Sequence, residues 1–245
     1  MRKKWIAASL TLLAMTIMNV TSAHALDVDT PYVEQGMLEV EMQNRFDFDH
    51  RTAEDRFRQH KLGIGYGFTS WWAAELEGEW EKEASHGYSY NATEIENVFQ
   101  FTEQGEYFLD AGAKLAYEWS HEQNHADKVE AALILAKPVG RFTHVANIGL
   151  EQEVGDHKNR NPEGDIKWMT QYNYMPLLNP GFEYYGELGE VSDMPDWNDQ
   201  KHRLGPVFYG KLGHGIKYEL GWLFGLSKAT EDHALKFNIE YEFPL

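Results

Sequence analysis

Six glutamates recur at alternate positions in two nearby segments: Glu75, Glu77, Glu79, Glu81, Glu94 and Glu96. Alternate side chains of an extended strand face the same way, so these carboxylates would form one acidic wall on neighbouring strands. Like charges at such close range need water, cations or basic partners if they are to stay ionised. The pattern therefore predicts either a wall that attracts cations or, with Arg45 and Lys61 as partners, a plug of ion pairs.

Histidine and serine offer two further kinds of chemistry. Imidazole near carboxylate is a ligand set for zinc, copper or nickel, and His121 and His125 would lie close if their segment makes one turn. A solvated loop is the simpler interpretation, so no metal or other cofactor is expected. Ser85 precedes His86 and Ser120 precedes His121, but both pairs fall in predicted loops without an orienting third group. The chain is therefore not expected to be an enzyme.

The composition excludes several classes of protein. The 245 residues contain 22 Lys and Arg against 39 Asp and Glu, and no Cys. An acidic chain is an unlikely partner for nucleic acid. Without cysteine, neither disulfides nor thiolate metal sites are available.

The first 25 residues have the pattern of a secretory signal peptide. Arg2, Lys3 and Lys4 precede an apolar stretch at 6–20 that is short for a membrane span, and Ala23-His24-Ala25 fits the small-x-small rule for cleavage. Removal of residues 1–25 would leave a formal charge of about −20 on residues 26–245. No later apolar run reaches about eighteen residues, so strands are the only way for this chain to span a membrane.

The rest of the chain shows strand alternation, most clearly near its end. Leu235, Phe237, Ile239 and Tyr241 alternate with polar residues, as in a strand with one face in lipid and the other in water. The same pattern predicts twelve strands, at 37–48, 59–68, 72–82, 93–101, 107–119, 128–136, 141–153, 165–174, 181–189, 201–211, 215–225 and 234–243. Pro206 lies within the tenth, so we expect a bulge there or a later start.

Short and long connections alternate between these segments. That pattern and the even strand count are typical of a transmembrane, antiparallel, up-and-down β-barrel, with long loops outside and short turns in the periplasm. The fold class is therefore all-β, with about twelve strands in one domain over residues 26–245. The polar faces carry nineteen acidic and ten basic side chains, which favours cations in the lumen. Inward glycines such as Gly63, Gly67 and Gly112 favour open space, while twelve strands lie between filled eight-stranded and open sixteen-stranded barrels.

The mature sequence resembles the outer-membrane β-barrel proteins of Gram-negative bacteria, in particular twelve-stranded porin-like channels and outer-membrane transport proteins of the phenol-degradation-pathway type. The resemblance implies a passive channel for small solutes, surrounded by outer-membrane lipids and lipopolysaccharide. A structural barrel that does not conduct and an outer-membrane lipid hydrolase are the alternatives, and the oligomeric state is left open. The chain departs from the usual terminal aromatic residue because Pro244 and Leu245 follow Phe243.

Overall fold

The computed structural model describes residues 26–51, 55–82, 87–159 and 161–245. The predicted signal peptide lies outside the described residues and stays a prediction. The described chain forms twelve strands: β1 (Met37–Phe48), β2 (Arg58–Gly67), β3 (Trp72–Lys82), β4 (Ser89–Gln100), β5 (Asp110–Ser120), β6 (Asp127–Val139), β7 (Phe142–Val154), β8 (Glu163–Tyr172), β9 (Asn179–Glu190), β10 (Lys201–Gly213), β11 (Ile216–Gly225) and β12 (His233–Pro244). No helix among the described residues is long and apolar enough to cross a membrane.

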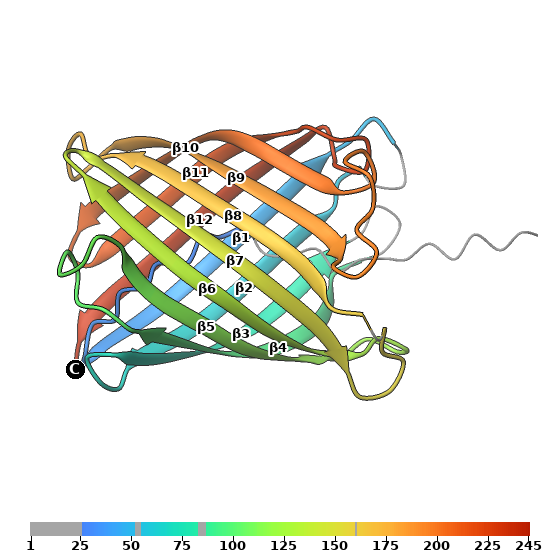
Figure 1. Cartoon of the computed structure of the whole chain (residues 1–245), viewed down its shortest axis with the longest axis horizontal. Coiled ribbons are helices and arrows are strands. Elements are labelled where there is room, and N and C mark those ends of the chain that lie inside the picture. The colour runs from blue at the N-terminus through green and yellow to red at the C-terminus, as the bar shows by residue number, and fades with distance from the viewer. Residues whose placement is uncertain (1–25, 52–54, 83–86, 160) are drawn as a thin grey trace, which may run out of the picture.

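Every strand pairs antiparallel with its neighbours in sequence, and the sheet closes on itself (Figure 1). β12 completes the barrel against β1, with Leu38 opposite Phe243 and Phe48 opposite His233. Closure leaves no sheet edge whose backbone groups would lie unpaired in hydrocarbon. The predicted all-β, up-and-down barrel is confirmed, and each of the twelve predicted strands is found within a few residues of its expected bounds.

The two ends of the barrel differ in the length of their connections. We call one end the loop end: it carries the connections that follow β1, β3, β5, β7, β9 and β11. The other is the turn end, where β6 and β7 are joined by residues 140–141 and β10 and β11 by residues 214–215. The link between β4 and β5, residues 101–109, is longer than the expected turn. Figure 1 shows the turn end at the left, beside the C-terminus.

Side chains alternate between the outer surface and the lumen along each strand. In β2, Leu62 and Ile64 are both 50% exposed on the outside, whereas Lys61, which precedes Leu62 and faces the lumen, is buried. Large apolar side chains are exposed in the same way on β3, β6 and β7, for example Leu76, Leu133 and Ile148. An apolar outer belt of this kind matches a surface that faces lipid.

The expectation of a bulge at Pro206, or of a later start of this strand, is wrong. β10 begins at Lys201 as predicted, and Pro206 pairs with Phe182 of β9 without a shift of register. Toward β11, the pairs Leu204–Phe224 and Val207–Gly221 keep one register on either side of the proline. The bulge of this strand lies at Lys211–Gly213 instead, beside the turn. The ladder therefore tolerates the missing N–H at one position because the flanking pairs hold the strand in place.

The outer belt gives a direct test of the strand register. Replacing Ile64 by arginine would place a charge in hydrocarbon and cost about 2 to 4 kcal/mol near the midplane. We expect a large loss of folded, heat-modifiable barrel on electrophoresis after refolding into lipid. Leu226→Arg is the matched control, because Leu226 is also exposed (45%) but lies in a connection at the loop end. Equal losses from the two substitutions would contradict the register.

Candidate functional site in the barrel lumen

Residues 26–36, which precede β1, lie inside the barrel (Figure 1). We call this stretch the N-terminal segment. Leu26 and Val28 are only 5% and 7% exposed, and they pack in one cluster with inward side chains of seven strands, β6 to β12. These side chains are Ile134, Ala136, Val145, Met169, Tyr185, Val207, Tyr209, Leu223 and Ala234. The segment therefore covers an apolar part of the lumen wall.

Polar contacts fix the N-terminal segment along its length. The backbone N–H of Asp29 donates to Asn147 Oδ1 at 2.9 Å, and Asn147 Nδ2 donates back to the carbonyl oxygen of Asp29 at 2.9 Å. Nearer the turn end, Tyr32 Oη donates to Asp110 Oδ2 at 2.8 Å, and the N–H of Val33 donates to Gln100 Oε1 at 2.8 Å. The sequence analysis missed this segment: its alternation, Leu26-Asp27-Val28-Asp29, was too short to indicate a strand.

The inward glycines make room for neighbours rather than for open space. A Cβ atom on Gly67 would lie 2.0 Å from the carbonyl oxygen of Glu34, and one on Gly112 would lie 2.9 Å from Pro31 Cβ. A Cβ on Gly63 would lie 1.8 Å from Glu75 Oε1. The expectation that these glycines widen the lumen is therefore wrong. They let the N-terminal segment and one of the glutamates lie against the wall.

Three lysines of the lumen, Lys61, Lys114 and Lys236, are each shared among several carboxylates. Lys61 Nζ lies 2.8 Å from Glu94, 3.0 Å from Glu77 and 3.7 Å from Glu79. Lys114 Nζ lies 3.1 Å from Asp29, 3.3 Å from Glu96 and 3.3 Å from Glu130. Fully buried Lys236 contacts Glu219 at 2.6 Å, Glu183 at 3.1 Å and Asp27 at 3.5 Å. A buried charge needs such partners, and acidic groups outnumber the basic ones in each cluster.

A cavity of about 490 Å³ remains between the N-terminal segment and the lumen faces of the strands. All twelve strands contribute to its lining, and most of the lining residues come from β1–β5, β11 and β12. Sixteen acidic and six basic side chains line it. Five of the six glutamates singled out in the sequence are among them, namely Glu75, Glu77, Glu79, Glu94 and Glu96. Glu81 is not: it accepts hydrogen bonds from Gln59 Nε2 at 3.2 Å and Asn91 Nδ2 at 3.0 Å.

Part of this acidic lining lacks a basic partner. Carboxylate oxygens of Glu39, Glu41 and Glu75 lie within 4.8 Å of one another, and Glu75 Oε1 is buried without a hydrogen bond. In the part of the chain that the structure describes, no lysine or arginine forms an ion pair with these three. Close by, Lys217 bridges Glu240 and Glu242. Sequence alternation missed the Glu39, Glu41 and Glu75 group because it joins β1 to β3 across β2.

The histidines and serines do not form the arrangements considered from sequence. His121 Nε2 lies 2.8 Å from Thr93 Oγ1 and its ring stacks on Tyr90, while His125 Nδ1 pairs with Glu122. The two histidines thus have separate partners. Ser120 Oγ accepts the N–H of Glu122, and among the described residues no serine hydroxyl is bonded to an imidazole. Ser85 and His86 lie outside the described residues.

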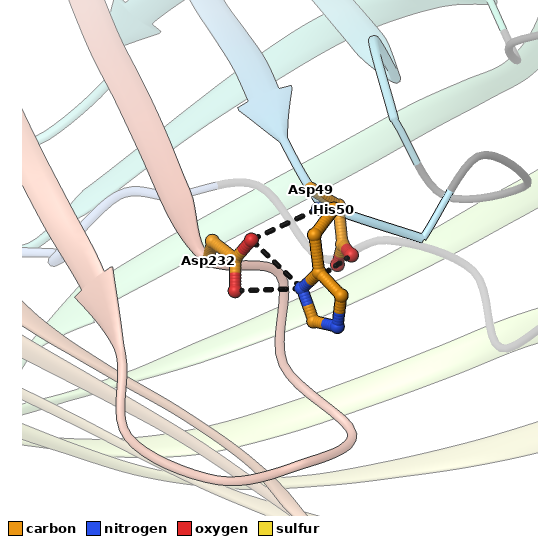
Figure 2. Close-up of side chains that lie close together, drawn as sticks. All are labelled: Asp49, His50 and Asp232. Atoms are coloured by element: carbon orange, nitrogen blue, oxygen red, sulfur yellow. Dashed lines mark hydrogen bonds and ion pairs between the residues drawn. The ribbon is translucent and has the colours of Figure 1, made fainter.

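A cluster of Asp49, His50 and Asp232 joins two connections at the loop end (Figure 2). His50 Nδ1 lies 2.9 Å from Asp232 Oδ2 and 3.5 Å from Asp49 Oδ1. Asp49 accepts the backbone N–H of Arg51 at 2.6 Å and Nε of Arg51 at 2.9 Å. These bonds from Arg51 lower the pKa of Asp49, and the bond from His50 lowers the pKa of Asp232.

The Asp49–His50–Asp232 cluster fits an ion-pair clasp better than a metal site. A metal at Asp49 would have to displace Arg51, whose guanidinium also donates to the carbonyl oxygen of Thr230 at 2.9 Å. The cluster lies where β1 pairs with β12. It links the connection that follows β1 to the connection that precedes β12.

The barrel resembles solved outer-membrane channels. The COG4313 outer membrane channel from Pseudomonas putida F1 aligns with a TM-score of 0.65 and 10% identity, over 89% of this chain and 100% of that chain. The KdgM porin gives 0.57 and 9%, over 84% and 99%, and the NanC porin gives 0.56 and 10%, over 85% and 100%. No family model and no curated protein matches the sequence. Identities this low show the fold alone. That fold, with its apolar belt, is the fold of the outer-membrane β-barrels, as the sequence predicted.

The contacts of Asn147 predict how firmly the N-terminal segment is held. A cysteine at Val28 should react slowly with a thiol reagent in the folded protein, because this position is buried. Adding Asn147→Ala removes two hydrogen bonds to Asp29, and we expect labelling about tenfold faster or more. The native chain has no cysteine, so labelling reports only position 28.

Asn97→Ala serves as the control for this experiment, because Asn97 bonds to Trp72 Nε1 and not to the N-terminal segment. Fast labelling of the Val28→Cys protein without any further substitution would contradict the fixed position of the segment. So would equal labelling rates with and without the added Asn147→Ala substitution.

Proposed function

We propose that the protein is a passive channel for small solutes in the outer membrane of a Gram-negative bacterium, and that it prefers cations. The observation that carries this proposal is the cavity of about 490 Å³ with sixteen acidic and six basic lining residues. A low-dielectric wall focuses the field of the charges that line it, so excess carboxylates raise the local concentration of cations and exclude anions. The likeness of the fold to solved outer-membrane channels supports a passive channel, and the preference for cations rests on the lining charges alone.

We assign the conducting path to the acidic part of the lumen. Beside β6–β12 the lumen is partly filled, because Leu26 and Val28 pack there on inward side chains such as Ile134 and Val207. Apolar packing fills the lumen there, so this part differs from the ion-paired plug that the sequence left open as an alternative. The path therefore follows β1–β4 and β12, where Glu39, Glu41 and Glu75 line the cavity.

Not every lumen glutamate should contribute equally to cation preference. Glu77 and Glu94 face each other in register and share Lys61, so much of their charge is offset. Glu39, Glu41 and Glu75 have no lysine or arginine ion pair within the described chain. A passing cation would offset their mutual repulsion, which gives this group the strongest claim to ion selectivity.

The triple substitution Glu39→Gln, Glu41→Gln and Glu75→Gln tests this assignment. It removes up to three negative charges and keeps side-chain size, so pore dimensions should change little. We expect the wild-type protein to prefer potassium over chloride in a planar bilayer and the triple variant to prefer it less, as read from reversal potentials in a salt gradient. The difference should shrink at high salt because screening shortens the reach of each charge.

A matched control removes three exposed acidic charges outside the cavity: Glu103→Gln, Glu106→Gln and Asp156→Asn. It changes the net charge by the same amount and should leave the reversal potential unchanged. Equal shifts in both variants would assign selectivity to overall charge rather than to the cavity. A wild-type protein without ion preference would overturn the proposed selectivity.

A further inference from the structure

Two basic side chains lie directly opposite each other on the outer surface of the barrel, near the loop end. Arg58 at the start of β2 pairs in register with Lys82 at the end of β3. Side chains alternate along a strand, so Arg58 shares the outward face of Leu62 and Ile64, and Lys82 shares that of Leu76. These are the cations of β2 and β3 that face away from the lumen, because Lys61 points inward.

Among the described residues, no acidic side chain pairs with either of these two cations. Over residues 26–51, 55–82, 87–159 and 161–245, neither side chain forms an ion pair or a hydrogen bond. Like charges directly opposite on neighbouring strands destabilise a sheet. Outward basic residues near the turn end differ: Lys137 donates to the carbonyl oxygen of Phe108, and Arg141 donates to those of Asn173 and Tyr174. Arg58 and Lys82 therefore lack the partners that comparable residues have.

Aromatic side chains beside the pair indicate its depth in the membrane. The Arg58 guanidinium lies 5.9 Å from the ring centroid of Phe46, and Lys82 Nζ lies 5.7 Å from that of Tyr88. Tyr88 Oη in turn lies 3.0 Å from His60 Nε2, and the rings of Trp80 and Tyr90 pack at 5.0 Å. Amphipathic rings in such a band occupy the boundary between hydrocarbon and headgroups. The two cations beside them lie at the level of lipid phosphates.

We propose that Arg58 and Lys82 together bind a phosphate group of the glycolipid in the outer leaflet, the phosphorylated lipid A of lipopolysaccharide. A phosphate between them would replace their repulsion by two charge-assisted hydrogen-bonded contacts. The neighbouring rings of Phe46 and Tyr88 would contact the sugar and the upper part of the acyl chains. The assignment to this leaflet rests on the proposed location, with the loop end at the cell surface.

The test uses the full folded barrel in detergent and purified lipid A as the probe, with bound lipid counted by native mass spectrometry. We expect wild-type protein to retain lipid A and the Arg58→Gln, Lys82→Gln variant to bind it about tenfold more weakly or worse, as loss of a charge-assisted hydrogen bond produces. The control Lys158→Gln, Lys228→Gln removes two exposed lysines from connections at the same end. It should bind like the wild type.

A second readout separates loss of binding from loss of folding. Without lipid, the Arg58→Gln, Lys82→Gln variant should unfold at the same temperature as the wild type or higher, because a like-charge contact has been removed. With lipid A, only the wild type and the control should gain stability. Equal binding by both variants, equal binding of dephosphorylated lipid A, or a preference for phosphatidylglycerol would overturn the proposal. None of these readouts depends on conductance, so the channel proposal stands or fails separately.

Discussion

Every backbone N–H and C=O within hydrocarbon must find its partner inside the protein, and the closed antiparallel ladder of twelve strands meets that requirement here. The rest of the structure depends on it. Closure forces successive side chains to alternate between lipid and lumen, so the apolar half of each strand covers the outside. The polar half, rich in glutamate, is confined to a narrow interior where charges must be offset by neighbours.

The N-terminal segment offsets some of the charges that are confined in the lumen and covers some of its apolar side chains. Its two aspartates contact lysines that project from opposite parts of the wall, Asp29 with Lys114 and Asp27 with Lys236. Its two apolar residues, Leu26 and Val28, cover inward apolar side chains that a polar lumen would leave exposed. One side of the interior thus becomes a packed core. The carboxylates on β1 and β3 that have no basic partner remain around the cavity, which is where an ion can be attracted.

The strands could be predicted because their pattern is local: in β3 and β12, for example, polar and apolar residues alternate along the sequence. The partners within the lumen could not. Lys61 lies opposite Glu79 in register, yet its nearer contacts are Glu77 and Glu94, one of them on the strand beyond. Such contacts depend on the tilt and stagger of the strands, which a sequence does not display. The expectation that the inward glycines leave open space was wrong for a similar reason. Gly67 and Gly112 make room for the N-terminal segment, whose alternation is too short to indicate a strand.

The central claim is that an acidic passage persists beside the N-terminal segment, and single-channel recording of the purified full-length barrel in a planar bilayer tests it most directly. The account predicts discrete openings of small conductance that carry potassium in preference to chloride. A folded barrel that inserts and conducts nothing, or one that prefers chloride, would contradict it.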